Sequence, residues 1–172
     1  GVGPPGRTGR DQLSVLREIT LPALARAGTV PAVAVCCSQT PAAHLAALRN
    51  RGAHVHLVSC MGNLHSSVIE FFIRSGAPGV IACGCPPRDC VSREGPKWLH
   101  ERLFNDREAE LQPRVDRHRV GIATLAPGDL AGTVAAYEQF TRRLAALAPL
   151  QPEANVELDT LCDPVSLEET AK

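Results

Sequence analysis

Three short apolar runs that each end in cysteine constrain the fold of this chain more than any other feature. The runs occupy residues 33–37, 55–60 and 80–85. They are short, contain β-branched residues, and are followed by turn-forming residues, which is typical of buried strands. Segments with helical spacing of apolar residues separate them. Strands that alternate with helices predict βαβ units, and therefore a parallel sheet with helices on both faces.

The spacing of apolar residues, glycines and prolines sets the expected boundaries. We predict strands over 30–37, 55–59, 79–83 and 120–125. We predict helices over 11–27, 41–51, 98–112, from Gly62 to Gly76, and from Leu130 onward. Pro22 is expected to kink the first helix, and Asp129 to cap the last one. The predicted fold class is α/β, a four-stranded parallel sheet in the flavodoxin-like order 2-1-3-4.

The length of 172 residues corresponds to one domain that can bury a core without disulfides. Residues 1–10 are rich in glycine and proline and are interpreted as a linker or a trimmed end. Residues 11–149 form the predicted α/β domain. Residues 150–172 form a polar, acidic tail.

Composition narrows the class of function. The chain has 18 basic and 18 acidic residues and no long basic block, which argues against nucleic-acid binding. No apolar stretch reaches the roughly 18 to 20 residues that cross a bilayer. Seven cysteines, an odd number, occur without a signal-peptide pattern. This usage indicates a reducing compartment, and we expect a cytoplasmic protein with metal or redox use of its thiols.

The predicted strand order places the first strand between the second and the third. Cys37, Cys60 and Cys85 then meet at the carboxyl edge of the sheet, where open α/β sheets bind ligands. Iron–sulfur clusters and zinc sites both use four thiolates, and Cys90 in the following loop supplies a fourth. The predicted metal ligands are therefore Cys37, Cys60, Cys85 and Cys90. Spacing alone leaves an iron–sulfur cluster, zinc and a dithiol redox pair open.

The remaining cysteines have other expected roles. Cys36 is offset by one residue from Cys37 and should point to the opposite face of the sheet as a buried thiol. Cys83 should point to the same face of the sheet as Cys85 but lie deeper. It is expected to lie beside the metal ligands or to replace one of them. Cys162 lies in the acidic tail without a motif.

Other candidate sites are weak. His54 and His56 lie on one face of a strand, but the histidines show no metal-binding spacing, and His65 is interpreted as a helix-start residue. No strand–turn–helix dinucleotide fingerprint and no phosphate-binding loop of the Walker type occur. No arrangement of residues favours catalysis, so no catalytic residue is predicted.

Several stretches resemble one known family. The stretches Cys36-Cys37, Cys60-Met61-Gly62 and Arg93-Glu94-Gly95, together with the Gly-Cys-x-Pro-x-Asp-Cys pattern of residues 84–90, resemble the delta subunit of methyl-viologen-reducing hydrogenase. The similarity covers roughly residues 30–147. The resemblance implies a small electron-transfer subunit with a two-iron, two-sulfur (2Fe-2S) cluster. It also implies redox partners: a hydrogenase or other dehydrogenase, a ferredoxin-like protein, and a heterodisulfide-reductase-like flavoprotein.

One position departs from the pattern of the family. Its first cysteine pair is usually followed by another cysteine three residues later, where this chain has Thr40, which cannot supply a thiolate. Two alternatives therefore stand beside the electron carrier. One is an assembly module with structural zinc or free thiols. The other is a thiol–disulfide oxidoreductase that uses Cys85 or Cys90, for which a lowered thiol pKa is required.

Overall fold

The sheet contains four parallel strands in the order β2-β1-β3-β4. The computed structural model describes residues 8–20, 22, 30–105 and 111–150. The strands are β1 (Val33–Cys37), β2 (His54–Val58), β3 (Val80–Gly84) and β4 (Val120–Thr124). Their order confirms the fold class and topology predicted from the sequence, and each strand boundary lies within three residues of its prediction.

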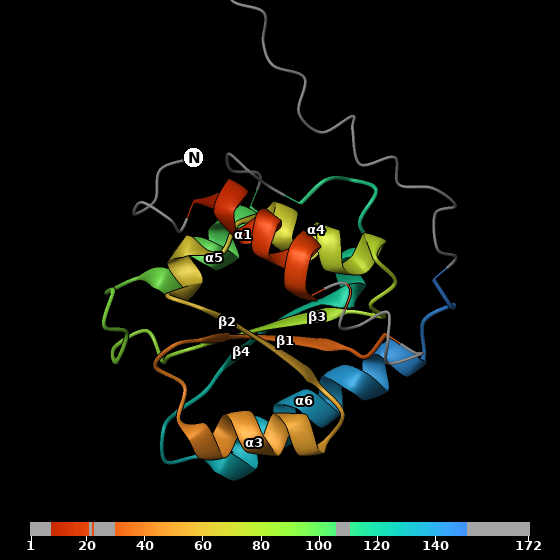
Figure 1. Ribbon diagram of the computed structural model, residues 1–172. Coiled ribbons are helices and arrows are strands. Elements are labelled where there is room, and N and C mark those ends of the chain that lie inside the picture. Colours follow the sequence, from red (N-terminus) through yellow and green to blue (C-terminus); the bar gives the residue numbers. More distant parts are fainter. Residues whose placement is uncertain (1–7, 21, 23–29, 106–110, 151–172) are drawn as a thin grey trace, which may run out of the picture.

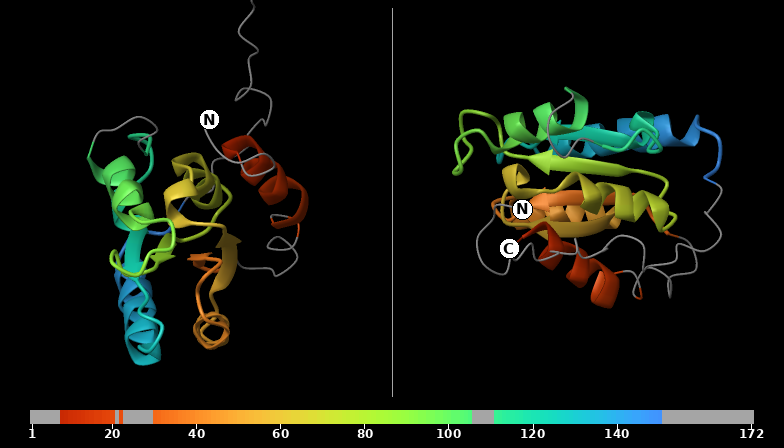
Figure 2. Two further views of the ribbon diagram at one scale, coloured as in Figure 1. Left: turned by 90° about the vertical axis from the view of Figure 1, so that its left-hand side faces the viewer. Right: turned by 90° about the horizontal axis from the view of Figure 1, so that it is seen from above.

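Helices cover both faces of this sheet (Figures 1 and 2). One face carries α1 (Gly9–Val15) with its short π-helical continuation η1 (Leu16–Thr20), α4 (Ser66–Arg74) and α5 (Gly95–Phe104). The other face carries α3 (Ala42–Asn50) and α6 (Leu130–Ala145). No helix among the described residues is long and apolar enough to cross a membrane.

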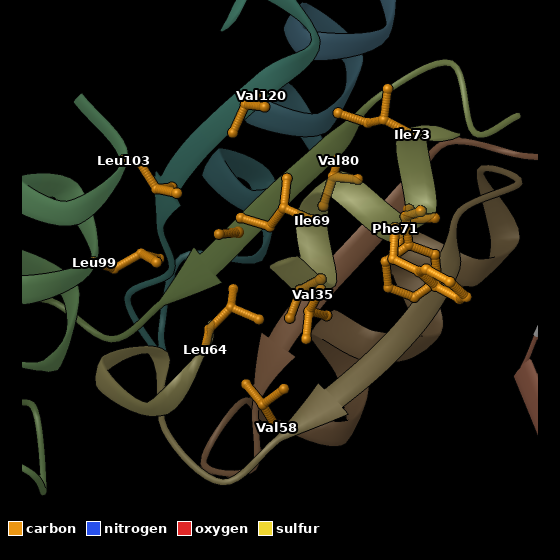
Figure 3. Packing of buried hydrophobic residues seen from close by; sticks show 14 of the residues in the cluster. Val35, Val58, Leu64, Ile69, Phe71, Ile73, Val80, Leu99, Leu103 and Val120 are labelled. Atoms are coloured by element: carbon orange, nitrogen blue, oxygen red, sulfur yellow. The ribbon is translucent and has the colours of Figure 1, made fainter. Parts of the chain in front are cut away.

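Each face has its own hydrophobic core. In Figure 3, Val35 of β1, Ile69 of α4 and Leu99 of α5 point into the core beneath α4 and α5. The second core joins the sheet to Leu48 of α3 and Phe140 of α6. All residues of β1 and β3 are buried, because both strands are central and covered on both faces. This position explains why their sequences are continuous apolar runs without alternation.

Local capping interactions set several helix boundaries. The Asp129 side chain accepts a hydrogen bond from the Gly132 N–H at 2.7 Å, which confirms the predicted N-cap of α6. His65 caps α4 by accepting from the Ser67 N–H at 3.2 Å, as expected for a helix-start residue. The residues between β2 and α4 form a short 3-10 turn, η2 (Met61–Asn63), so the helix starts later than predicted.

Two further predicted helices differ from the structure at their ends. α1 begins at Gly9, capped by Thr8, and the segment 11–27, predicted as a helix kinked or divided at Pro22, is described only in part. α5 begins at Gly95 rather than at residue 98, because the proline that follows Gly95 fits a first helical turn. Residues 106–110 of the predicted helix, most of the expected linker and the tail from residue 151 lie outside the described residues.

His54 and His56 pack against the fully buried ring of Phe72, at centroid distances of 6.2 and 5.4 Å. Burial, followed by the charge of His54, lowers the pKa of His56 to about 4. Burial and the charge of Arg49 lower the pKa of His54 as well. Both rings therefore belong to the packing of β2 on α4 and stay neutral at pH 7.

This packing predicts a pH-dependent stability. Above pH 6.5, His56 is neutral in both the native and the unfolded chain, so its lowered native pKa does not change the free energy of unfolding. As the pH falls from 6.5 to 4, the unfolded chain binds a proton at His56 that the native chain does not bind. We expect the free energy of unfolding, measured by urea denaturation, to fall by about 2 to 3 kcal/mol across this range. His56→Phe should remove most of this fall. An unchanged pH profile in that variant would contradict the assignment.

Candidate metal centre

Two of the predicted ligands, Cys37 and Cys85, lie side by side at the carboxyl edge of the sheet. Cys37 is the last residue of β1, and Cys85 directly follows β3, the neighbouring strand. Their sulfurs are 3.8 Å apart. Both pack against the core on the α4 and α5 side, where Cys37 is buried and Cys85 is partly exposed. The parallel pairing of β1 with β3 thus brings residues 48 positions apart into contact.

The other two predicted ligands, Cys60 and Cys90, flank the start of α5. A β-carbon built on Gly95 would lie 2.6 Å from the Cys60 sulfur and 3.5 Å from the Cys90 sulfur. A β-carbon on Gly62 would lie 2.9 Å from the Gly95 Cα, so the η2 turn and the first turn of α5 touch through two glycines. Cys60 and Cys90 therefore both lie beside Gly95 at the start of α5.

Hydrogen bonds and charge act on these thiols. The Gln39 N–H donates to the Cys37 sulfur at 3.5 Å, and the Gly62 N–H donates to the Cys60 sulfur at 3.4 Å. Burial raises the pKa of the Cys85 thiol to about 12, with further contributions from Cys37 and then Cys90. The Cys85 thiol therefore resists ionisation. A bound cation reverses this effect, because its charge favours the thiolate form.

Arg102 of α5 supports the turn that carries Cys60. Its Nη2 donates to the Gly62 carbonyl oxygen at 2.8 Å and to the Leu64 carbonyl oxygen at 3.2 Å. Burial lowers the pKa of Arg102, and the nearby Cys60 thiol opposes that shift. The guanidinium therefore fixes the η2 turn and places positive charge near the thiols, where it stabilises a negatively charged thiolate group.

The sequence leaves two kinds of metal centre open at these thiols, an iron–sulfur cluster and a zinc ion. Thiolates on one tetrahedral ion with bonds of about 2.3 Å lie about 3.8 Å apart, which matches Cys37 and Cys85. Nowhere in residues 8–20, 22, 30–105 and 111–150 do three potential metal ligands gather around a single ion position. The spacing of Cys37 and Cys85 thus suits two thiolates on one metal ion, which both kinds of centre contain.

Cys36 and Cys83 lie away from the site. They are partners in the β1–β3 register and belong to the core beneath α3 and α6. The expected position of Cys36 on the opposite face from Cys37 is confirmed. The expected shared facing of Cys83 and Cys85 is wrong, because β3 ends at Gly84 and the chain turns before Cys85. A hydrogen bond with Cys36, followed by burial, raises the pKa of Cys83.

Sequence reasoning missed three residues that shape the site, Gly62, Gly95 and Arg102. Both glycines belong to the cysteine motifs, and a glycine beside a proposed ligand can signal a close backbone approach. No local pattern pointed to Arg102, since it is 42 residues from Cys60 and meets it only in the folded chain.

A known protein family matches most of this chain. No curated protein matches the chain. The model of a protein family described as methyl-viologen-reducing hydrogenase, delta subunit, matches residues 32–148. The matched region contains all four strands and Cys37, Cys60, Cys85 and Cys90. The chain therefore belongs to the methyl-viologen-reducing hydrogenase delta subunit family.

Proposed function

We propose that this protein is an electron-transfer subunit that relays electrons through one 2Fe-2S cluster. The ligands are Cys37, Cys60, Cys85 and Cys90. The observation that carries the proposal is the 3.8 Å contact between Cys37 and Cys85 at the carboxyl edge of the sheet, with Cys60 and Cys90 both beside Gly95. One pair would hold each iron. The electrons would pass between a hydrogenase or other dehydrogenase and a flavoprotein related to heterodisulfide reductase.

The surroundings of the thiols suit such a carrier. A thiolate-bound iron–sulfur cluster takes up and releases single electrons, at a potential set by hydrogen bonds, charge and burial. The N–H groups of Gln39 and Gly62 already point at sulfurs, and Arg102 lies close to Cys60. These donors stabilise negative charge on the sulfurs, which favours the reduced state and raises the potential.

The site also lies near the molecular surface. Cys60, Cys85 and Cys90 are partly exposed, whereas Cys37 is buried. Two exposed apolar residues, Val91 and Trp98, stand next to Cys90 and the start of α5. Exposed apolar side chains around a redox centre are suited to contact with a partner protein. This position supports electron exchange with another protein rather than chemistry on a small substrate.

The alternatives receive less support. Structural zinc calls for four ligands around one ion, and the 3.8 Å contact between Cys37 and Cys85 brings two of the four thiols together. A thiol–disulfide oxidoreductase needs a thiol with a lowered pKa, whereas burial raises the pKa of Cys85.

Metal and sulfide analysis of anaerobically purified protein tests the proposal. We expect about two irons and two acid-labile sulfides per chain, with an electron paramagnetic resonance signal after reduction by dithionite. Cys85→Ala should abolish the signal and most of the iron. Cys83→Ala is the matched control, because Cys83 is two residues away but faces the other core. One zinc per chain, or no metal after anaerobic reconstitution, would refute the relay.

A further inference from the structure

A pocket lies between α1 and α4. Both helices cover the face of the sheet that also carries α5 (Figure 1). Its volume is about 560 Å³, and none of the cysteines lines it. The Gln12 side chain of α1 donates to the Asn63 carbonyl oxygen at 2.9 Å, and a β-carbon built on Gly9 would lie 3.3 Å from the His65 ring. These contacts hold α1 against the start of α4. The pocket is therefore built by a specific helix contact.

Arginines dominate the charged lining of this pocket. The arginines are Arg10, Arg17, Arg74 and Arg114. Glu70 is the one acidic side chain among the described lining residues. It is already engaged, because it accepts from the Gln112 N–H at 2.8 Å and from Arg114 at 3.4 Å. The pocket thus carries a surplus of positive charge that Glu70 does not neutralise.

Arg10 and Arg17 supply the positive charge that remains available. Within the described part of the chain, no ion pair joins either guanidinium to a carboxylate. The Arg17 guanidinium lies over the Phe71 ring, 5.5 Å from its centroid. The Arg17 Nε is buried and has no hydrogen-bond partner. A buried donor without a partner costs free energy, which an acceptor supplied by a ligand would recover.

The lining also defines the size and chemistry of a fitting ligand. Arginine presents its N–H groups in a planar fork that matches the oxygens of a phosphate. Leu13 and Phe71 add apolar surface beside these groups. The volume lies within the range of small-molecule pockets, roughly 300 to 1,000 Å³, and far exceeds the need of an inorganic phosphate. A ligand with both phosphate groups and an organic part satisfies all three features.

We propose that the pocket between α1 and α4 binds an organic phosphate of the nucleoside diphosphate class. The phosphates bind Arg10 and Arg17, and the organic part packs beside Leu13 and Phe71. The site differs from the known glycine-rich phosphate loops, since side-chain guanidinium groups take the place of backbone N–H groups. This inference is independent of the electron relay, because no residue of the pocket belongs to the cysteine site.

Isothermal titration calorimetry of the full chain with ADP as the probe tests the site. We expect saturable binding with one ADP per chain, weakening as salt is raised from 0.05 to 0.5 M. Arg17→Met keeps an apolar stem over Phe71 but removes the charge, and should weaken binding about tenfold or more. Arg142→Met removes an exposed arginine of α6 on the other face of the sheet and serves as the matched control.

A double variant and two comparison ligands complete the test. The double variant Arg10→Met with Arg17→Met should abolish ADP binding, while thermal unfolding without ligand verifies that it is folded. Pyrophosphate and adenosine should each bind at least tenfold more weakly than ADP. Absence of ADP binding at millimolar concentration would overturn the proposal. So would equal affinity for ADP and pyrophosphate, or unchanged affinity in the folded double variant.

Discussion

Replacement of Gly95 by alanine is expected to weaken iron binding at the proposed cluster site by about 10- to 100-fold, the range typical of residues that position metal ligands. The new β-carbon would lie 2.6 Å from the Cys60 sulfur and 3.0 Å from the Gly62 nitrogen. Both distances are shorter than van der Waals contact. The backbone nitrogen cannot move aside freely, so either the Cys60 side chain or the first turn of α5 must shift away from the site.

The effect should be specific to the metal centre. Alanine is a better helix former than glycine, so the change at the start of α5 does not weaken the helix through its intrinsic propensity. Gly128→Ala is the control, because a β-carbon at Gly128 meets no atom within 4 Å. Iron and sulfide per chain, measured in both variants after anaerobic reconstitution, check the prediction. Wild-type iron content in the Gly95 variant would contradict the geometry of the Cys60–Cys90 pair.

Replacement of Phe72 by alanine is expected to lower the free energy of unfolding by about 3 to 5 kcal/mol. Phe72 is fully buried in the core between α4 and the sheet. Removing its ring leaves a cavity and takes away the contacts with His54 and His56. The loss is large against the 5 to 15 kcal/mol that stabilises a typical domain. Urea denaturation at pH 7.5, followed by circular dichroism, measures it.

A partly buried ring provides the comparison. Phe104 packs against the same core but is only partly buried, so Phe104→Ala should cost less than half as much. The Phe72 variant should also lose part of the pH dependence between pH 6.5 and 4, because water reaches His56 once the ring is gone. A stability loss equal to that of Phe104→Ala would contradict the central place of Phe72 in the core.

The sheet could be predicted from the sequence because its signals are local. Buried strands such as residues 80–84 are continuous apolar runs, and glycine and proline mark the turns that follow them. A parallel sheet then places every strand end at one edge, so Cys37 and Cys85 could be expected near each other. Helix starts were less predictable. His65 and Pro96 set the starts of α4 and α5 through interactions that apolar periodicity does not report.

The facing of Cys83 shows where reasoning from periodicity fails. Alternation along a strand places residues 83 and 85 on the same side only while the chain stays extended. β3 ends at Gly84, and the following turn carries Cys85 to the side of Cys37, leaving Cys83 with Cys36. The point at which a strand ends depends on its neighbours, and periodicity within a single strand does not determine it.

The α/β fold class and the placement of strand-end cysteines at one sheet edge could be read from the sequence, because apolar spacing and turn residues act over short distances along the chain. Only the folded chain shows that Cys37 lies against Cys85, that Gly62 approaches Gly95, and that several arginines line one pocket. Gly62 meets Gly95, and α1 meets α4, only after the two cores have packed. These contacts join distant segments through shape and burial, which no local pattern encodes.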